Sequence, residues 1–111
     1  MKQNGMRPVP PGEILKEEFL KPLGMTPFAL AKAIEVPANR ITAILRGERG
    51  ITGDTAIRLG AFFNTSAEFW MNLQVTYELR RAQKKLSPRV RKIIAEHRSA
   101  WAPMSTDASH R

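Results

Sequence analysis

The sequence predicts an all-α fold in which five short helices form a compact domain and an amphipathic helix follows near the C-terminus. Apolar residues recur at intervals of three and four, as on one face of a helix, and no strand-like alternation is long enough to trust. Prolines, glycines and capping residues divide the chain into short helical segments. With 111 residues, 42% of them apolar, the chain has room for one modest core.

The first helix is expected after an extended, proline-containing lead-in at residues 7–12. Pro22 and Gly24 are expected to end it. Four apolar residues at helical spacing form its expected buried stripe: Ile14, Leu15, Phe19 and Leu23.

A second helix is predicted to begin at Thr26, an N-cap residue followed by proline. Its expected buried stripe is Phe28, Ala31 and Ile34. Residues 35–37 are too few for anything but a tight turn. A third helix then runs from Ala38 to Arg46, and its apolar side consists of Ile41, Ile44 and Leu45.

After a glycine-containing loop at residues 46–53, a fourth helix is expected at about Asp54 to Phe63 and ends at Asn64. Its expected core residues are Ala56, Leu59 and either Phe62 or Phe63. Thr65 and Glu68 have the spacing of a capping box, which predicts the start of a fifth helix. One face of that helix carries Phe69, Trp70, Leu73 and Tyr77.

Ser87 and Pro88 predict the start of the C-terminal helix. A narrow apolar stripe follows it, with His97 as an expected packing residue: Val90, Ile93, Ile94 and Trp101. We therefore divide the chain into a domain at residues 7–82, a basic helix at 83–102 and a disordered tail at 103–111.

The positive charge is concentrated in the C-terminal third. The formal net charge is +8; residues 1–75 carry nine basic and seven acidic side chains, and residues 76–111 carry nine basic and three acidic ones. Such an excess favours anionic partners, although a basic run is also often only a solvated face.

The second and third helices, with their three-residue turn, form a helix-turn-helix pattern. Ala31 is small where the helices must cross, and Val36 and Ile41 supply apolar contacts. The outward face of the third helix can then enter a major groove. Asn39 can bond an adenine edge in two places, and Arg40 or Arg46 can reach a guanine edge or a phosphate.

The segment at residues 30–47, LAKAIEVPANRITAILRG, resembles the Xre/Cro-type helix-turn-helix family. Further segments are similar to the HigA, or VapI-like, antitoxins of toxin–antitoxin modules: PPGEIL (10–15), FLKPLGMT (19–26), RGERGIT (46–52) and RLGAFFNTSAEFWMNLQ (58–74). The chain departs from the pattern at Pro10, where the family often has histidine, and at Glu78, where it often has aspartate.

The resemblance implies a five-helix, lambda-repressor-like domain that binds a palindromic operator as a homodimer and represses its own operon. It also implies neutralisation of a cognate RelE-like (HigB-type) mRNA-endonuclease toxin; a stand-alone repressor is the alternative. The candidate DNA-binding residues are Thr26, Ala38, Asn39, Arg40, Thr42, Ala43 and Arg46. For Asn39, Thr42 and Arg46, a solvated helix face is the competing interpretation, and for Arg40 a phosphate contact is an equal alternative to a base contact.

Two further surfaces are expected to bind proteins. Glu13, Glu17 and Glu18 fall on one side of the first helix and are candidates for toxin contact, although surface charge explains them as well. The stripe of Val90, Ile93, Ile94 and Trp101 must be covered by the domain core, a second subunit or the toxin. We favour the second subunit and thus a role in dimerisation.

The composition argues against an enzyme. The chain has no cysteine and only two histidines, and it shows neither a recognisable catalytic spacing nor a glycine-rich phosphate loop. We expect no metal and no cofactor. No apolar stretch approaches the roughly 20 residues of a membrane span, so we expect a cytoplasmic protein; a membrane-surface role for the basic helix is a remote alternative.

Overall fold

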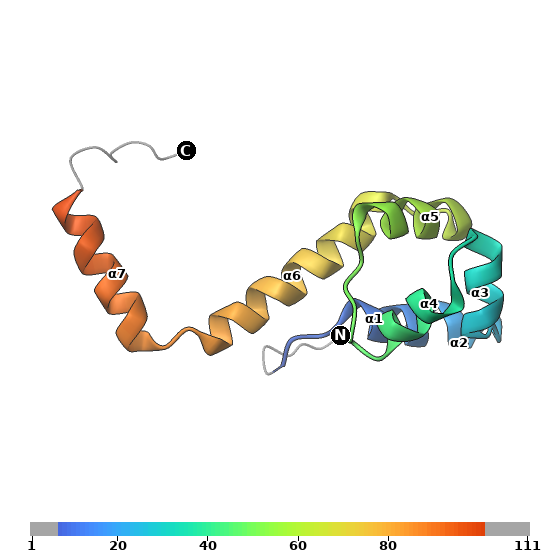
Figure 1. Cartoon of the computed structure of the whole chain (residues 1–111), viewed down its shortest axis with the longest axis horizontal. Helices are drawn as coiled ribbons and strands as arrows, with labels where there is room; N and C mark the ends of the chain where they lie inside the picture. The colour runs from blue at the N-terminus through green and yellow to red at the C-terminus, as the bar shows by residue number, and fades with distance from the viewer. Residues whose placement is uncertain (1–6, 102–111) are drawn as a thin grey trace. The chain divides into compact units, whose positions relative to one another are not determined.

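The computed structural model describes residues 7–101, which form helices and turns and contain no β-strand (Figure 1). The first helix is continuous and comprises α1 (Pro11–Ile14), the π-helical η1 (Leu15–Leu20) and α2 (Lys21–Leu23). Five helices follow: α3 (Pro27–Ile34), α4 (Ala38–Leu45), α5 (Gly53–Phe63), α6 (Ala67–Lys85) and α7 (Pro88–Ala100). The predicted all-α fold is confirmed.

The first helix ends at Gly24, one of the two residues expected to end it, and passes through the other, Pro22. Gly24 is in the left-handed region with a φ of 62°. The N–H of Lys21 bonds to the carbonyl of Lys16, five residues back, instead of four. A proline ring clashes with the carbonyl four residues before it, and the π-helical turn widens the hydrogen-bond ladder there.

The π-helical segment also changes which residues face the core. Leu15 and Leu20, five residues apart, are both buried, because i to i+5 pairing brings residues with that spacing over one another. Leu23, expected in the buried stripe, is 62% exposed. The expectation for Leu23 was therefore wrong, and Leu20 takes the core position.

The predicted start of α3 is confirmed, since the Oγ1 of Thr26 accepts a hydrogen bond of 3.0 Å from the N–H of Ala29. Its buried residues are Leu30, Ala31 and Ile34. Phe28 was expected among them but is 68% exposed. Leu30 and Ile34 are four apart and define the inward side, and Phe28 lies more than 100° away from both.

The turn after α3 and the buried side of α4 also agree with the prediction. Glu35 adopts a left-handed conformation with a φ of 59°, and the N–H of Val36 bonds to the carbonyl of Ala31 at 3.0 Å. Ile41 and Ile44 are fully buried, while Leu45 packs at the edge of the core.

The boundary between α5 and α6 contains one correction. As predicted, α5 ends at Asn64, whose φ is 59°. Glu68 and Thr65 do not form the expected capping box; the Oγ of Ser66 accepts from the N–H of Phe69 at 3.0 Å. Ser66 takes the capping role because it directly precedes the first helical residue of α6, Ala67. Thr65 instead accepts a hydrogen bond from the indole N–H of Trp70 at 2.8 Å.

Aromatic side chains from three helices close the core. Trp70 of α6 is fully buried. The ring of Phe19 lies 4.9 Å from that of Trp70 and 4.8 Å from that of Phe63, centroid to centroid. Of the two aromatic candidates on α5, Phe63 therefore packs on the core and Phe62 is exposed. Phe69 also lies at the surface.

The chain divides into two compact units between Arg81 and Ala82. In the second unit, Ser87 caps α7 by accepting from the N–H of Val90 at 3.1 Å, as predicted. α7 has no buried residue, and Trp101 is 70% exposed. The predicted tail at 103–111 lies outside the described residues. Among residues 7–101, no helix is both long and apolar enough to cross a membrane.

Candidate nucleic-acid interface

The inner side of α4 is fixed by an unusually close approach of the first helix. Gly12 is buried, and a Cβ added to it would collide with the backbone carbonyl of Ile44. Only glycine allows the two backbones to come this close. The opposite side of α4 is thereby held outward as part of a rigid unit.

The outward side of α4 consists of the polar residues that the sequence predicted. Asn39 and Arg46 are exposed, and Ala38, Thr42 and Ala43 are half-buried. The hydroxyl of Thr42 donates to the carbonyl of Asn39 at 3.3 Å, a long bond that leaves the oxygen free to accept. Thr26 is exposed at the N-terminus of α3, and its hydroxyl is used as the cap.

Arg40 behaves differently from its neighbours on α4. Its guanidinium pairs with Asp54 of α5 at 2.8 Å, and its side chain is only 23% exposed. Its Nε is buried and has no hydrogen-bond partner. The structure thus directs Arg40 toward Asp54 of α5, and a DNA contact would require Arg40 to leave this ion pair.

Asp54 also connects α5 to the helix-turn-helix turn through Arg58. The Nε of Arg58 lies 3.0 Å from Asp54. The Nη1 of Arg58 donates to the carbonyls of Ile34 and Glu35, at 2.7 and 3.1 Å, where α3 ends. Hydrogen bonds from Arg40 and then from Arg58 lower the pKa of Asp54. One carboxylate therefore braces both helices of the motif.

The loop after α4 is held by Gln74, a buried polar residue of α6. Its Oε1 accepts from the N–H of Ile51 at 2.8 Å, and its Nε2 donates to Glu78 at 2.8 Å. A Cβ on Gly50 would lie 2.8 Å from that Nε2. Sequence reasoning missed Gln74, because nothing local to α6 shows that a distant backbone N–H requires an acceptor.

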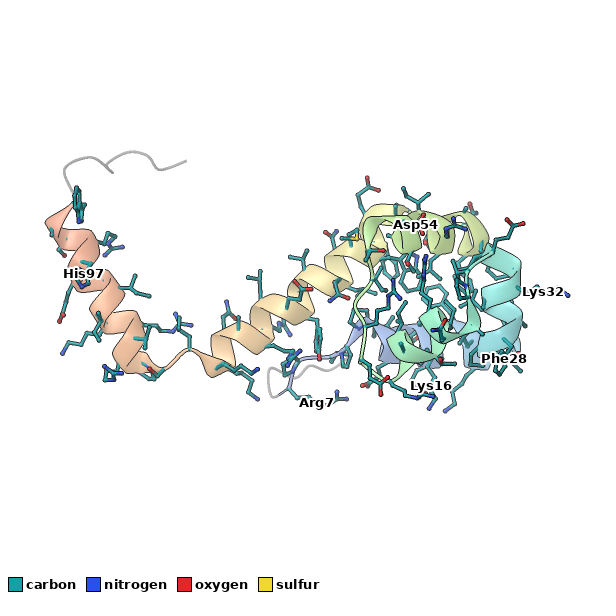
Figure 2. The ribbon with its side chains drawn as sticks, viewed as in Figure 1. Arg7, Lys16, Phe28, Lys32, Asp54 and His97 are labelled. Atoms are coloured by element: carbon teal, nitrogen blue, oxygen red, sulfur yellow. The ribbon has the colours of Figure 1, made fainter. Side chains whose placement is uncertain are left out.

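Sequence reasoning also missed two lysines beside Arg46, at the end of α4. Lys16 and Lys21 of the first helix line a depression together with Arg46, next to the start of α3. Lys21 pairs with Glu17 at 3.1 Å, whereas Lys16 is exposed (Figure 2). Arg46 pairs loosely with Glu48 at 3.6 Å. This edge of α4 is therefore basic, as a phosphate-contacting edge should be.

Two of the three predicted toxin-binding glutamates have cationic partners in the chain. Glu13 pairs with Arg7 at 2.9 Å, and this hydrogen bond lowers the pKa of the Glu13 carboxyl. Glu17 pairs with Lys21. Glu18 is exposed. No group of three or more potential metal-ligating side chains occurs within residues 7–101.

A crossed helix pair with a three-residue turn, a rigidly held second helix and a polar outer face define a helix-turn-helix protein. Comparison of the chain with known proteins leads to the same class of protein. The family described as "Helix-turn-helix" matches residues 16–70. Virulence-associated protein I of Dichelobacter nodosus is 49% identical over 82 residues, which cover 74% of this chain and 76% of that protein.

Two solved structures are also similar. A Pseudomonas aeruginosa protein in complex with its 18-bp operator DNA is 49% identical, with a TM-score of 0.73, and the match covers 77% of this chain and 91% of that one. The P. aeruginosa antitoxin HigA with the higBA promoter is 46% identical, with a TM-score of 0.65, over 74% of this chain and 98% of that one.

The chain belongs to the Xre-type helix-turn-helix family, in the group that includes the VapI-like proteins and the HigA antitoxins. The resemblance seen in the sequence is confirmed. This is a family of DNA-binding proteins and not of enzymes.

Proposed function

We propose that the protein is an antitoxin and autorepressor, which binds a palindromic operator as a homodimer and neutralises a cognate toxin. The observation that carries the proposal is the exposed polar face of α4, held outward by the packing of Gly12 against Ile44. Relatives of close to half identical sequence bind operator or promoter DNA.

In this proposal α4 enters the major groove. Asn39 reads an adenine edge through its amide, and Arg46 contacts a phosphate, with Lys16 beside it on the basic edge. The two α4 helices of a dimer would occupy half-sites roughly 34 to 36 Å apart. Thr26, Ala38, Thr42 and Ala43 complete the surface by close approach to the DNA. Arg40 acts mainly through Asp54, as a positioning residue.

We place the dimer contact on the apolar stripe of α7. Val90 is half-buried, and Ile93, Ile94 and Trp101 are exposed. A 13-residue helix with such a stripe is marginal in water on its own. Covering it with the same stripe of a second subunit buries both, while the arginines beside it stay in solvent.

The proposed toxin is a RelE-like, HigB-type mRNA endonuclease. Glu18, which is exposed, is a better candidate for its contact than Glu13, which is paired with Arg7. A stand-alone repressor remains the second candidate function. A small basic reading frame directly beside the gene supports the antitoxin, and a gene without such a neighbour supports the repressor.

The proposal is tested by two separate measurements. Gel-shift titration with DNA from upstream of the gene should show a palindromic site bound by a dimer. Co-expression with the neighbouring gene product should yield a stable complex and relieve its growth arrest. The double variant Asn39→Ala and Arg46→Ala should lose operator binding and still neutralise, because the two activities are assigned to different faces. Loss of neutralisation in a folded double variant would contradict this separation.

A further inference from the structure

The cations of α7 have no ion-pair or hydrogen-bond partner among residues 7–101, unlike Arg40 and Arg58 of the first unit, which are bound to Asp54. Residues 82–101 contain six lysines and arginines and one acidic residue, Glu96. Four exposed cations lie on α7 itself: Arg89, Arg91, Lys92 and Arg98. None of the four makes an ion pair or a side-chain hydrogen bond with another residue of the range 7–101.

These cations lie beside the apolar stripe and not on it. Arg91 and Arg98, two turns apart, line a shallow groove with Leu86 and Ile94. On an ideal helix, Arg89 lies on the other side of the stripe and Lys92 lies nearly opposite to it. Pairing of the stripe with a second subunit therefore leaves all four cations available to another partner.

We infer that α7 is a second DNA-binding element, which contacts the phosphates of the duplex beside the operator without reading its sequence. This inference rests on the proposed function, because α3 and α4 must first bring the chain to DNA. Once they do, the covalent connection raises the effective concentration of α7 near the duplex. α7 lies beyond residues 16–70, which the family shares.

The chemistry of the four side chains fits phosphates. Three of them are arginines, whose planar guanidinium binds phosphate oxygens bidentately. Thirteen residues of helix extend about 20 Å, and B-DNA presents roughly 12 phosphates over that length of axis. A cation on the side of α7 that faces the duplex therefore has a phosphate within reach of its flexible side chain, without any special register.

Two other partners fit less well. A toxin that binds RNA is expected to be basic, and it would be repelled by these cations. An anionic membrane would need the apolar stripe to enter the lipid interface, and the proposed dimer occupies that stripe. Binding of α7 to an anionic membrane is therefore one of the results that the experiment distinguishes.

The test uses the full chain with all four cations replaced: Arg89→Gln, Arg91→Gln, Lys92→Gln and Arg98→Gln. Glutamine keeps the helix propensity and leaves the stripe intact. The matched control replaces the three arginines by lysine and so keeps the charge. Affinity is measured as a function of salt on the operator alone, on the operator with extended flanks, and on an unrelated duplex.

On the flanked operator and on the unrelated duplex, the slope of log K against log salt should become shallower in the glutamine variant. The expected change is about 0.9 for each phosphate that the variant no longer neutralises, or about 3.6 per protomer for all four. The control should keep the wild-type slope. The affinity for the operator without flanks should change far less. Sedimentation of the glutamine variant should still show a dimer.

Unchanged slopes on both long duplexes would overturn the inference, and so would an effect confined to vesicles containing phosphatidylserine. A shallower slope on the unrelated duplex, together with no operator preference in the wild type, would instead contradict the proposed function and uphold α7 as a DNA-binding element. The two failures are therefore distinguishable.

Discussion

The two units of the chain contain arginines that are held in different ways. In the first unit, Arg40 and Arg58 are tied to Asp54, and Arg58 also binds the carbonyls at the end of α3. In the second unit, the cations of α7 are exposed and α7 has no buried residue. A core that fixes side-chain positions suits recognition of particular bases, whereas exposed charge on a solvated helix suits recognition of any phosphate backbone.

The largest effect on DNA binding is expected from removing the proposed dimer contact on α7, in the second unit. Ile93→Asp, or truncation after Leu86, should convert the dimer to a monomer, because a carboxylate cannot be buried in the apolar stripe. Loss of bivalency should lower the affinity for the full operator by about 10² to 10⁴-fold and the affinity for a single half-site far less. Sedimentation together with titration on both duplexes measures this. An intact dimer after truncation would move the contact to another surface.

The next effect probes the rigidity of the first unit. Gly12→Ala should destabilise the fold by about 3 kcal/mol, because the added methyl group collides with the Ile44 backbone, which cannot move without shifting α4. Gly53→Ala is the control, since nothing lies within 4 Å of its added Cβ. We expect a change of about 0.5 kcal/mol or less for it. Urea denaturation measures both, and equal costs would show that the close approach is unimportant.

A smaller effect sharpens the distinction between base and phosphate contacts. Asn39→Ala should cost about 1–3 kcal/mol of binding at one base position and relax the preference there. Arg46→Ala should weaken binding to all sequences and reduce the salt slope by about one unit. Titration against an operator set with single substitutions measures the difference. Equal weakening on every sequence by Asn39→Ala would reassign Asn39 to the backbone.

The smallest effect concerns how the ion pair between Arg40 of α4 and Asp54 of α5 contributes to stability at low pH. The pKa of Asp54 is lowered in the folded state by its bonds to Arg40 and Arg58. The stabilisation is therefore present above the ordinary aspartate pKa of about 3.9 and is lost as the pH falls below it. Asp54→Asn should lose less stability than the wild type between neutral pH and pH 3.

Thermal unfolding at the two pH values tests this prediction. Glu13→Gln is the comparison variant, because the pKa of Glu13 is lowered by Arg7 in the same direction. Only Asp54→Asn should also weaken operator binding at neutral pH, since Asp54 braces the recognition helix and Glu13 does not. Equal DNA affinities of the two variants would limit Asp54 to a role in stability.

Several features could be predicted because they depend on short-range backbone chemistry. The caps at Thr26 and Ser87 and the end of α5 at Asn64 need only residues within one turn. The three-residue turn and the buried side of α4, with Ile41 and Ile44, follow from helical periodicity. The sequence by itself thus determined the helix order, the helix-turn-helix motif and the outward placement of Asn39 and Arg46.

Other features were decided by residues far away in the chain. The π-helical segment exchanges Leu23 for Leu20 in the core, and Phe28 is exposed because Leu30 faces the other helices. Arg40 is engaged by Asp54, 14 residues on, and Gln74 supplies an acceptor for the N–H of Ile51, 23 residues back. Only the tertiary structure could decide these pairings, because burial and ion pairing depend on which side chains the packed helices bring together, and periodicity describes each helix alone.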